Sequence, residues 1–297
     1  MRLVTRGDLD GLACAVIITS HEPITEIVLL HPQDITNDLA EIQEGDIIAN
    51  LPFHPACGLW FDHHLITGTN RRPPGDFRGR YEQAPSAAQL VWEHYGQEGK
   101  WNRLVEETNR LDSAQLEMAD VVEPDGYILL GYTIDSRTGL GSFEFYFREC
   151  VEWVKQLPVD EVLQQPMVAE RIRRIRDEDA SFRTALEANS RLEGNVIVTD
   201  FRDEFIPPIG NRFLVYTLYP EANVSLRLHW GPEREFVVAA VGHSIFNRSC
   251  QTRVGDLMAR YGGGGHVGAG SAPLPVDSAE EKITEILTVL RADDGQS

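Results

Sequence analysis

The sequence predicts an α/β protein: a parallel-sheet N-terminal domain, then a connecting helix, then a smaller mixed α/β C-terminal domain. Three observations predict this class. In the first half of the chain, short apolar runs alternate with segments of helical periodicity. In the middle, residues 166–192 form one long charged segment with Pro166 at its start and Gly194 just beyond its end. After it come several short apolar segments, one helical segment and a glycine run.

The N-terminal elements follow from the apolar pattern. Residues 127–134 are apolar almost throughout, so periodicity does not decide there between helix and strand. Residues 66–82 are rich in Gly, Pro and Arg and are predicted as a long loop, which is either a functional lid or a mobile surface excursion. The other predicted elements are strands at 2–5, 26–30, 46–49 and 58–61, a turn at 7–11, and helices at 12–20, 34–43, from Pro85 onward, and at 101–111. Strands and helices that alternate at this spacing indicate βαβ units and a mostly parallel sheet.

The C-terminal elements are more mixed. We expect strands at 195–200, 213–219, 224–230 and 236–241, a helix at 255–261, and then the glycine run 262–265 with His266 directly after it. The predicted domain limits are 1–150 for the first domain, 151–193 for the helical linker and 194–297 for the second domain.

The composition indicates a globular cytoplasmic protein. The four cysteines, Cys14, Cys57, Cys150 and Cys250, are far apart and form no CxxC pair. That pattern argues against a zinc knuckle and against a secreted disulfide framework. The charged N-terminus is unlike a signal peptide, and no run of eighteen apolar residues occurs, so we expect no membrane span.

The charge balance bears on the substrate. The chain has 27 Lys and Arg against 46 Asp and Glu, a net charge of −19. Such an acidic protein repels long polyanions unless a local basic patch prevails. We therefore expect a short phosphorylated substrate, such as a single-stranded oligonucleotide, and no duplex DNA. An acidic proteome in the source cell is an alternative explanation of the charge.

Carboxylates and imidazoles stand at the ends of several predicted strands. The triplet Asp62-His63-His64 follows the apolar run 59–61, Asp8 and Asp10 follow the first strand, and Asp135 follows the apolar segment 127–134. Oxygen and nitrogen ligands of this kind suit a divalent metal ion. In an open α/β sheet, ligands bind just outside the carboxyl ends of the strands. The pattern predicts a metal site, and the alternative is a hydrogen-bond network without metal.

A second group of residues is a candidate for binding phosphate. Gly263, Gly264 and Gly265 lack side chains, so their backbone N–H groups can approach an anion closely, and His266 can donate to the same anion. Arg248 lies nearby in sequence. The alternative is a flexible turn without a ligand. Arg137, two residues after Asp135, is either a phosphate contact or a plain surface arginine.

These motifs, in this order, resemble those of the DHH phosphoesterase superfamily with its DHH-associated C-terminal domain. That superfamily includes RecJ-type exonucleases, nano-RNases, cyclic-dinucleotide phosphodiesterases, exopolyphosphatases and family II pyrophosphatases. The resemblance implies an active site in the cleft between two domains. It also implies hydrolysis of phosphoesters or phosphoanhydrides with Mn²⁺ or Mg²⁺.

The resemblance also implies roles for single residues. Asp8 matches a ligand of the first metal, and Asp10, His63 and Asp135 match ligands of the second. Asp62 and His64 match the catalytic positions, with His64 facing the substrate.

Two positions depart from the superfamily pattern. Where the superfamily usually has a histidine before the two aspartates, this chain has Thr5 and Arg6. Where an aspartate bridges the two metals, the chain has Asn50, which we still count as a candidate ligand. We therefore expect one well-formed metal site and a doubtful second one. Asp112 and Asp120 are expected to cap or solvate helices.

Two functions remain open at this point. One is a metal-dependent phosphoesterase, related to exopolyphosphatases, that hydrolyses an oligoribonucleotide, a cyclic dinucleotide or polyphosphate. The other is a degenerate, non-catalytic member that binds a nucleotide or phosphate ligand. The sequence leaves a homodimer open.

Overall fold

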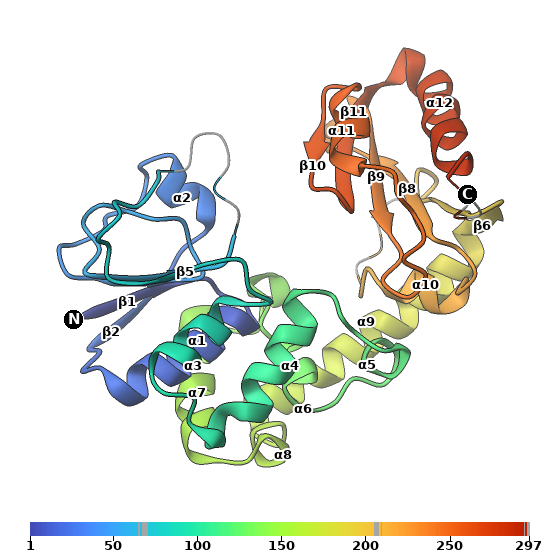
Figure 1. The fold of residues 1–297 in the computed structure, drawn as a ribbon. Coiled ribbons are helices and arrows are strands. Elements are labelled where there is room, and N and C mark those ends of the chain that lie inside the picture. The colour runs from blue at the N-terminus through green and yellow to red at the C-terminus, as the bar shows by residue number, and fades with distance from the viewer. Residues whose placement is uncertain (65, 67–70, 205–207, 209, 294, 296–297) are drawn as a thin grey trace. The chain divides into compact units, whose positions relative to one another are not determined.

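A computed structural model describes residues 1–64, 66, 71–204, 208, 210–293 and 295 (Figure 1). Its contacts divide the chain into two compact units. Unit 1 comprises Met1–Gln115 and Pro124–Arg174, and unit 2 comprises Leu116–Glu123 and Ile175–Ser297. The predicted limits at 150 and 193 differ from this division, which falls inside the long helix α9 (Pro166–Asn189). The predicted α/β class, with one parallel and one mixed sheet, is confirmed.

Unit 1 contains a five-stranded sheet in the order β2-β1-β3-β4-β5, and every neighbouring pair is parallel. Its strands are β1 (Arg2–Thr5), β2 (Glu26–Leu29), β3 (Ile47–Ala49), β4 (Leu59–Asp62) and β5 (Gly79–Tyr81). Because β1, β3 and β4 are neighbours, their carboxyl ends lie side by side at one edge of the sheet. This edge is where the candidate metal ligands were predicted.

The helices of unit 1 pack mainly on one face of that sheet (Figure 1). They are α1 (Leu9–His21), α2 (Pro32–Thr36), α3 (Ala87–His94), α4 (Asn102–Asp112), α6 (Gly126–Thr133), α7 (Phe143–Gln156), α8 (Val159–Val162) and the first part of α9, with short 3₁₀ turns at Gly99–Trp101 and Ser136–Thr138. The first ten residues of α1 are all buried, so this helix is the centre of the unit.

Side chains alternate between the two faces of the sheet, as strand geometry requires. Leu3, Ile47 and Phe61 face the core that α1, α3 and α7 share. On the other face, Val4 and Trp60 pack into a smaller core, where the Trp60 indole N–H donates to the Leu51 carbonyl at 2.9 Å. Both faces are therefore covered, which fits a parallel sheet.

Unit 2 contains a six-stranded mixed sheet in the order β10-β11-β9-β8-β7-β6. Only β7 and β8 are parallel; the other neighbouring pairs are antiparallel. Its strands are β6 (Ser190–Glu193), β7 (Val196–Asp200), β8 (Val224–Trp230), β9 (Phe236–His243), β10 (Gly264–Gly265) and β11 (Ala269–Pro275). Its helices are α5 (Met118–Val122), α10 (Leu214–Leu218), α11 (Val254–Ala259), α12 (Ala279–Arg291) and the second part of α9, with 3₁₀ turns at Pro232–Arg234 and Val276–Ser278.

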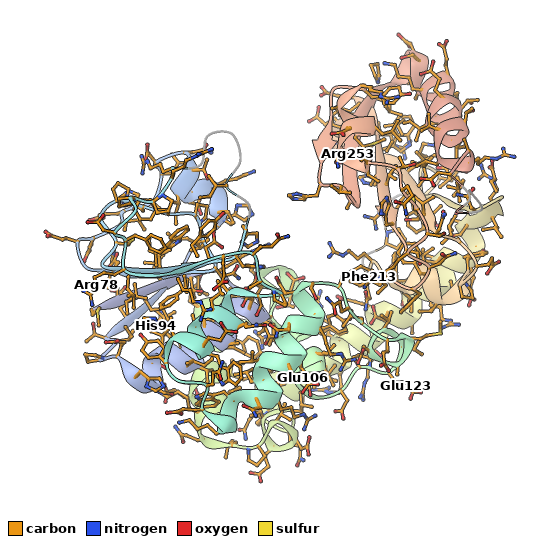
Figure 2. The ribbon with its side chains drawn as sticks, viewed as in Figure 1. Arg78, His94, Glu106, Glu123, Phe213 and Arg253 are labelled. Atoms are coloured by element: carbon orange, nitrogen blue, oxygen red, sulfur yellow. The ribbon has the colours of Figure 1, made fainter. Side chains whose placement is uncertain are left out.

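One predicted strand is wrong. Within residues 213–219, Leu214–Leu218 form the short helix α10, and Figure 2 labels Phe213, the residue before its start. Three consecutive residues from Leu214 are buried, and the hydroxyl of Tyr216 reaches β8 and β9, 2.7 Å from Ser225 Oγ and 2.8 Å from the Gly242 carbonyl. A short apolar run gives the same pattern for a buried strand and a buried helical turn, so tertiary packing decided here.

Other boundaries differ in smaller ways. The helix predicted at 34–43 ends at Thr36, and α1 starts at Leu9, inside the predicted turn. Residues 127–134, which the sequence left undecided, belong to helix α6. β5 lies in the segment predicted as a loop, of which residues 67–70 are outside the described structure. Among the described helices, none has both the length and the hydropathy to cross a membrane.

Candidate metal centre and active site

The candidate site lies where β1, β3 and β4 end. Asp8 and Asp10 follow β1, Asn50 follows β3, and Asp62 is the last residue of β4, with His63 next. Because these strands are adjacent and parallel, residues far apart in sequence meet at one edge. This arrangement explains how short motifs about fifty residues apart form one site.

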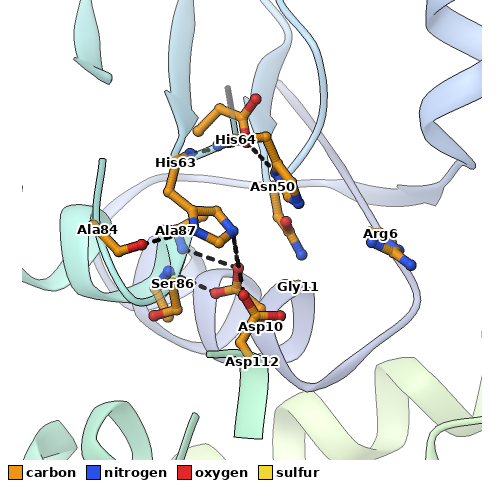
Figure 3. Close-up of polar contacts among 12 residues, drawn as sticks. Arg6, Asp10, Gly11, Asn50, His63, His64, Ala84, Ser86, Ala87 and Asp112 are labelled. Carbon is orange, nitrogen blue, oxygen red and sulfur yellow. Dashed lines mark hydrogen bonds and ion pairs between the residues drawn. The ribbon is translucent and has the colours of Figure 1, made fainter. Parts of the chain in front are cut away.

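Three side chains gather as a group that could hold a metal ion, namely Asp10, His63 and Asp112 (Figure 3). One ligand atom from each lies within 4.8 Å of the other two. His63 Nε2 is 3.6 Å from Asp10 Oδ2 and 3.3 Å from Asp112 Oδ2. Oxygen and imidazole nitrogen ligands of this kind suit Mn²⁺ and Mg²⁺.

The orientation of His63 fits metal binding. Its Nδ1 is 3.0 Å from the Ala84 carbonyl oxygen, which can only accept, so Nδ1 carries the proton. In the neutral imidazole with this tautomer, Nε2 presents a lone pair toward the two carboxylates. It is buried and has no hydrogen-bond partner in the described structure. A lone pair that faces two anions needs a cation, and a ligating histidine typically donates its other N–H in this way.

Backbone N–H groups at the start of α3 fix the position of the Asp10 carboxylate. The carboxylate accepts the backbone N–H groups of Ala87 at 2.9 Å and Ala88 at 2.7 Å. Burial, and then the charges of Asp112 and Asp8, raise the pKa of Asp10 well above its usual value. Burial is also the main reason why the pKa of Asp112 is raised. The protein thus gathers carboxylates that repel each other, an arrangement that a bound cation would stabilise.

Asp8 has different partners. Its Oδ1 accepts the Gly11 backbone N–H at 2.8 Å, which caps α1, and the Asn50 Nδ2 group at 3.0 Å. Its Oδ2 lies 3.0 Å from Arg6 Nε. Asn50 has a positive φ of 58°, and its Oδ1 is buried without a partner in the described structure. The predicted metal roles of Asp8 and Asn50 remain predictions.

The first and third residues of the Asp-His-His triplet form a pair. Asp62 is buried, and its Oδ1 lies 2.8 Å from His64 Nδ1 and accepts the His63 backbone N–H at 2.9 Å. This hydrogen bond is the main reason why the pKa of His64 is raised above its usual value. The side chain of His64 is 47% exposed, so its other ring nitrogen can reach a ligand. This is the geometry of an aspartate that orients a proton-donating histidine.

Asp112 was expected only to cap or solvate a helix, and the structure brings its side chain into the candidate group with Asp10 and His63. It is the last residue of α4, and its side chain turns to His63. A signal was present, because a carboxylate at the C-terminal end of a helix opposes the helix dipole. Asp120 does cap a helix, as predicted, by accepting the Glu117 backbone N–H at 2.7 Å.

Two predicted residues lie close to the end of α6. Asp135 follows Ile134, the residue that ends this helix, and is half-buried. The three-residue group contains Asp112 where the sequence predicted Asp135. The side chain of Arg137 lies outside the described structure. The roles of Asp135 and Arg137 remain predictions.

In unit 2 the glycine run belongs to β10 and its turns. A Cβ on Gly263 would lie 2.0 Å from the Ser271 carbonyl oxygen, and one on Gly265 would lie 2.2 Å from that of Ala269. These two glycines are therefore required by the close approach of β11. A Cβ on Gly264 would meet nothing within 4 Å, so open space lies in front of that residue.

The other predicted phosphate contacts of unit 2 lie at its surface. His266 is exposed, and its backbone N–H donates to the Ala269 carbonyl at 2.7 Å. Arg248 is exposed, and its Nε donates to the Ile245 carbonyl at 3.0 Å. Their predicted role in substrate binding remains a prediction.

Unit 2 also contains a positively charged side chain, Arg227, that was not among the predicted site residues. Arg227 is half-buried on the polar side of β8, and burial lowers the pKa of its guanidinium. Over the described ranges it forms no ion pair with a carboxylate. The alternation of β8 could have revealed it, since an arginine stands between buried leucines in Leu226-Arg227-Leu228. A partly buried cation without a counter-ion can take an anion.

Sequence comparisons matched neither a family model nor a curated protein. Among solved structures, the chain is similar to the pGpG-specific phosphodiesterase PggH of Vibrio cholerae, with 37% identity, coverage of 98% of this chain and 99% of that one, and a TM-score of 0.88. Two further structures share the fold. One is the DHH domain of a member of a family of ribosomal proteins, with 13% identity, coverage of 98% and 86%, and a TM-score of 0.61. The other is RecJ of Thermus thermophilus in complex with Mn²⁺, with 14% identity, coverage of 98% and 52%, and a TM-score of 0.55. The resemblance in the motifs, the candidate metal-binding group of Asp10, His63 and Asp112, and the likeness to PggH over nearly the whole of both chains agree: the chain belongs to the DHH superfamily and is a phosphoric ester hydrolase.

Proposed function

We propose that the protein hydrolyses a short 5′-phosphorylated dinucleotide of the pGpG type, with a divalent metal ion, Mn²⁺ or Mg²⁺. The observation that carries this proposal is the 37% identity to a pGpG-specific phosphodiesterase over nearly the full length of both chains. The net charge of −19 supports a small anion rather than a long one.

Asp10, His63 and Asp112 are the residues that would hold the ion. When bound there, a divalent cation acts as a Lewis acid toward a phosphoryl oxygen and lowers the pKa of water that it ligates. The chain prepares this position beforehand. The Ala87 and Ala88 N–H groups orient Asp10, and the Ala84 carbonyl fixes the tautomer of His63.

In this proposal, His64 is the general acid. Asp62 accepts a hydrogen bond from His64 Nδ1–H, which favours the imidazolium and leaves the N–H on Nε2 to be donated. In the hydrolysis, a water oxygen forms a bond to phosphorus and the bond from phosphorus to the 3′-oxygen breaks. His64 gives its Nε2 proton to that leaving oxygen and the attacking water loses one proton to solvent. A proton taken up from solvent then restores the imidazolium. A dinucleotide such as pGpG then yields two mononucleotides.

The alternative of a non-catalytic binding protein has less support. The differences at Arg6 and Asn50 affect the side of the site around Asp8. They leave intact the gathered group Asp10, His63 and Asp112.

The test is product analysis with a set of matched substrates. Purified protein with Mn²⁺ is incubated with pGpG, with GpG that lacks the 5′-phosphate, with cyclic di-GMP, with a longer oligoribonucleotide and with polyphosphate. We expect GMP from pGpG at a higher kcat/KM than from any other substrate. Asp112→Asn should abolish turnover, and Asp160→Asn, which changes an exposed carboxylate on α8, should not. Faster release from polyphosphate, or no turnover of any substrate, would refute the proposal.

A further inference from the structure

Both carboxylate oxygens of Asp8 already have partners within the protein. One of its oxygens accepts two N–H groups, from Gly11 and from Asn50, and the other faces Arg6 Nε at 3.0 Å. Three donors therefore occupy the Asp8 carboxylate, and the positive charge of Arg6 beside Oδ2 disfavours a metal cation at the lone pair that is left. The group that gathers around His63 in the described structure does not contain Asp8.

Asn50 supports this arrangement. Its Nδ2 group donates to Asp8 at 3.0 Å, which an aspartate at the same position could not do. An aspartate would instead place a second carboxylate against Asp8. The neutral amide keeps the Arg6–Asp8 pair in place and brings no negative charge that would attract a second cation.

The Arg6 guanidinium has further N–H donors besides the one that faces Asp8. Its Nε faces Asp8, and this is the only ion pair that Arg6 makes within the described ranges. The side chain is 41% exposed, so the Nη groups remain open to a ligand. A guanidinium fixed by a carboxylate on one side presents its other N–H groups in a planar fork, which matches phosphate oxygens.

Arg6 is also close enough to act on the site. It lies on the same side of the metal-binding group as Asn50 (Figure 3). Its Nε lies 3.0 Å from Asp8 Oδ2, and Asp8 is in turn 3.0 Å from Asn50 Nδ2 and two residues before Asp10. A phosphate that contacts His64 and an ion held by Asp10, His63 and Asp112 would therefore also be attracted by the Arg6 guanidinium.

We propose that Arg6 supplies the second positive charge of the active site and binds the substrate phosphate, so that the enzyme works with a single metal ion and an arginine. Asp8 and Asn50 act as positioning residues for Arg6 and do not hold a metal. This inference deepens the proposed function and rests on it for the identity of the substrate.

The first test is the metal content. Wild type, Arg6→Ala and the double variant Arg6→Ala/Asn50→Asp are equilibrated with the same excess of Mn²⁺, and Mn is counted per chain by elemental analysis. We expect a single Mn in wild type and in Arg6→Ala, with Mn affinity unchanged within about threefold, and additional Mn in the double variant, since a carboxylate replaces the amide beside Asp8. Two Mn per chain in wild type would overturn the inference.

The second test is phosphate binding. GMP, a phosphate monoester, is titrated calorimetrically into the Mn-loaded proteins. We expect Arg6→Ala to weaken GMP binding by about 10- to 100-fold, the usual loss for hydrogen bonds to charged groups, and Arg6→Lys to weaken it less. Arg183→Ala is the matched control, since this arginine on α9 is 45% exposed and also pairs with a carboxylate. GMP affinity that is equal in Arg6→Ala and Arg183→Ala, or no GMP binding by wild type, would overturn the inference.

The two proposals fail separately. If GMP binding depends on Arg6 but pGpG is not hydrolysed, the substrate proposal is wrong and the role of Arg6 stands. If pGpG is hydrolysed with the same KM by wild type and Arg6→Ala, the proposed function stands and the role of Arg6 is wrong.

Discussion

The gathered carboxylates make a direct prediction about stability without metal. Replacing Asp112 by Asn removes one of the negative charges that face each other across the metal-binding group. Ligand atoms of Asp10 and Asp112 lie within 4.8 Å. At that separation two unit charges repel by about 3.5 kcal/mol at an effective dielectric near 20. Asp112 is 31% exposed, and solvent screening lowers the expected gain to about 1–2 kcal/mol.

The assay is thermal unfolding with EDTA and with Mn²⁺. Without metal, Asp112→Asn should melt higher than wild type by about 2–8 °C, since about 1 kcal/mol shifts Tm by a few degrees in domains of this size. With Mn²⁺, wild type should melt higher than the variant. At a Mn²⁺ concentration of a hundred times Kd, binding stabilises wild type by about 2.7 kcal/mol, whereas the variant binds the metal poorly. Asp160→Asn is the control and should change neither value. If the variant melts lower than wild type in EDTA, carboxylate repulsion does not determine how Asp112 affects the stability of the metal-free protein.

Burial of these carboxylates, and to a lesser degree the repulsion between them and Asp8, contributes to the pH dependence of stability. The pKa values of Asp10 and Asp112 are raised in the fold, so their contribution to stability is full below the unfolded-state pKa and is lost as pH rises through the folded-state pKa. In the metal-free wild type, the contribution of these two groups to stability should therefore fall as pH rises above about 4. Asp112→Asn should show a shallower decline, because the Asp10 carboxyl then ionises without that neighbour. Equal slopes for the two proteins in EDTA would contradict this account.

Three further predictions concern other parts of the molecule. Because the hydrogen bond to Asp62 raises the pKa of His64, Asp62→Asn should move the alkaline limb of the pH profile of kcat/KM to lower pH, and an unmoved limb would exclude His64 as the general acid. Gly264→Val should weaken GMP binding without changing Tm or Mn affinity. Gly263→Val should instead lower Tm, because a Cβ at this position would meet backbone atoms. A lower Tm in both variants would mean that the glycine run is only structural. Trp60→Ala, which empties a fully buried site on the sheet, should cost about 3–5 kcal/mol in denaturant unfolding, and a loss below about 1 kcal/mol would indicate that the smaller core repacks.

The N-terminal sheet was predictable because its strands carry their own signals. Each short apolar run, such as the one before Asp62, ends in a polar motif, and adjacent parallel strands bring those ends together. The region around Phe213 was not predictable in the same way. There the hydroxyl of Tyr216 bonds to two strands that come later in the sequence, and no local pattern encodes those contacts.

The state of Asp8 shows a second limit. Its position directly before an apolar helical segment could have been read as a helix cap. Its hydrogen bond from Asn50, however, comes from a residue 42 positions later, which has a positive φ of 58°, a backbone conformation uncommon for residues other than glycine. The sequence could show that the amide is neutral, but not that the amide donates to Asp8 and so takes part in holding Arg6.

Asp112 and Asp135 give the sharpest comparison between sequence and structure. The motif order pointed to Asp135 as the third ligand beside Asp10 and His63, whereas the structure brings Asp112 Oδ2 to 3.3 Å from His63 Nε2. We therefore expect Asp112→Asn to weaken Mn²⁺ binding at least about tenfold more than Asp135→Asn, because even residues that only orient metal ligands cost about 10- to 100-fold in affinity. Both substitutions remove one charge and keep the side-chain shape, so each serves as the electrostatic control for the other. Calorimetric Mn²⁺ titration of the two variants measures the difference. An equal loss would make both carboxylates ligands of the same ion, and a larger loss in Asp135→Asn would return the third ligand to the position that the motif order indicates.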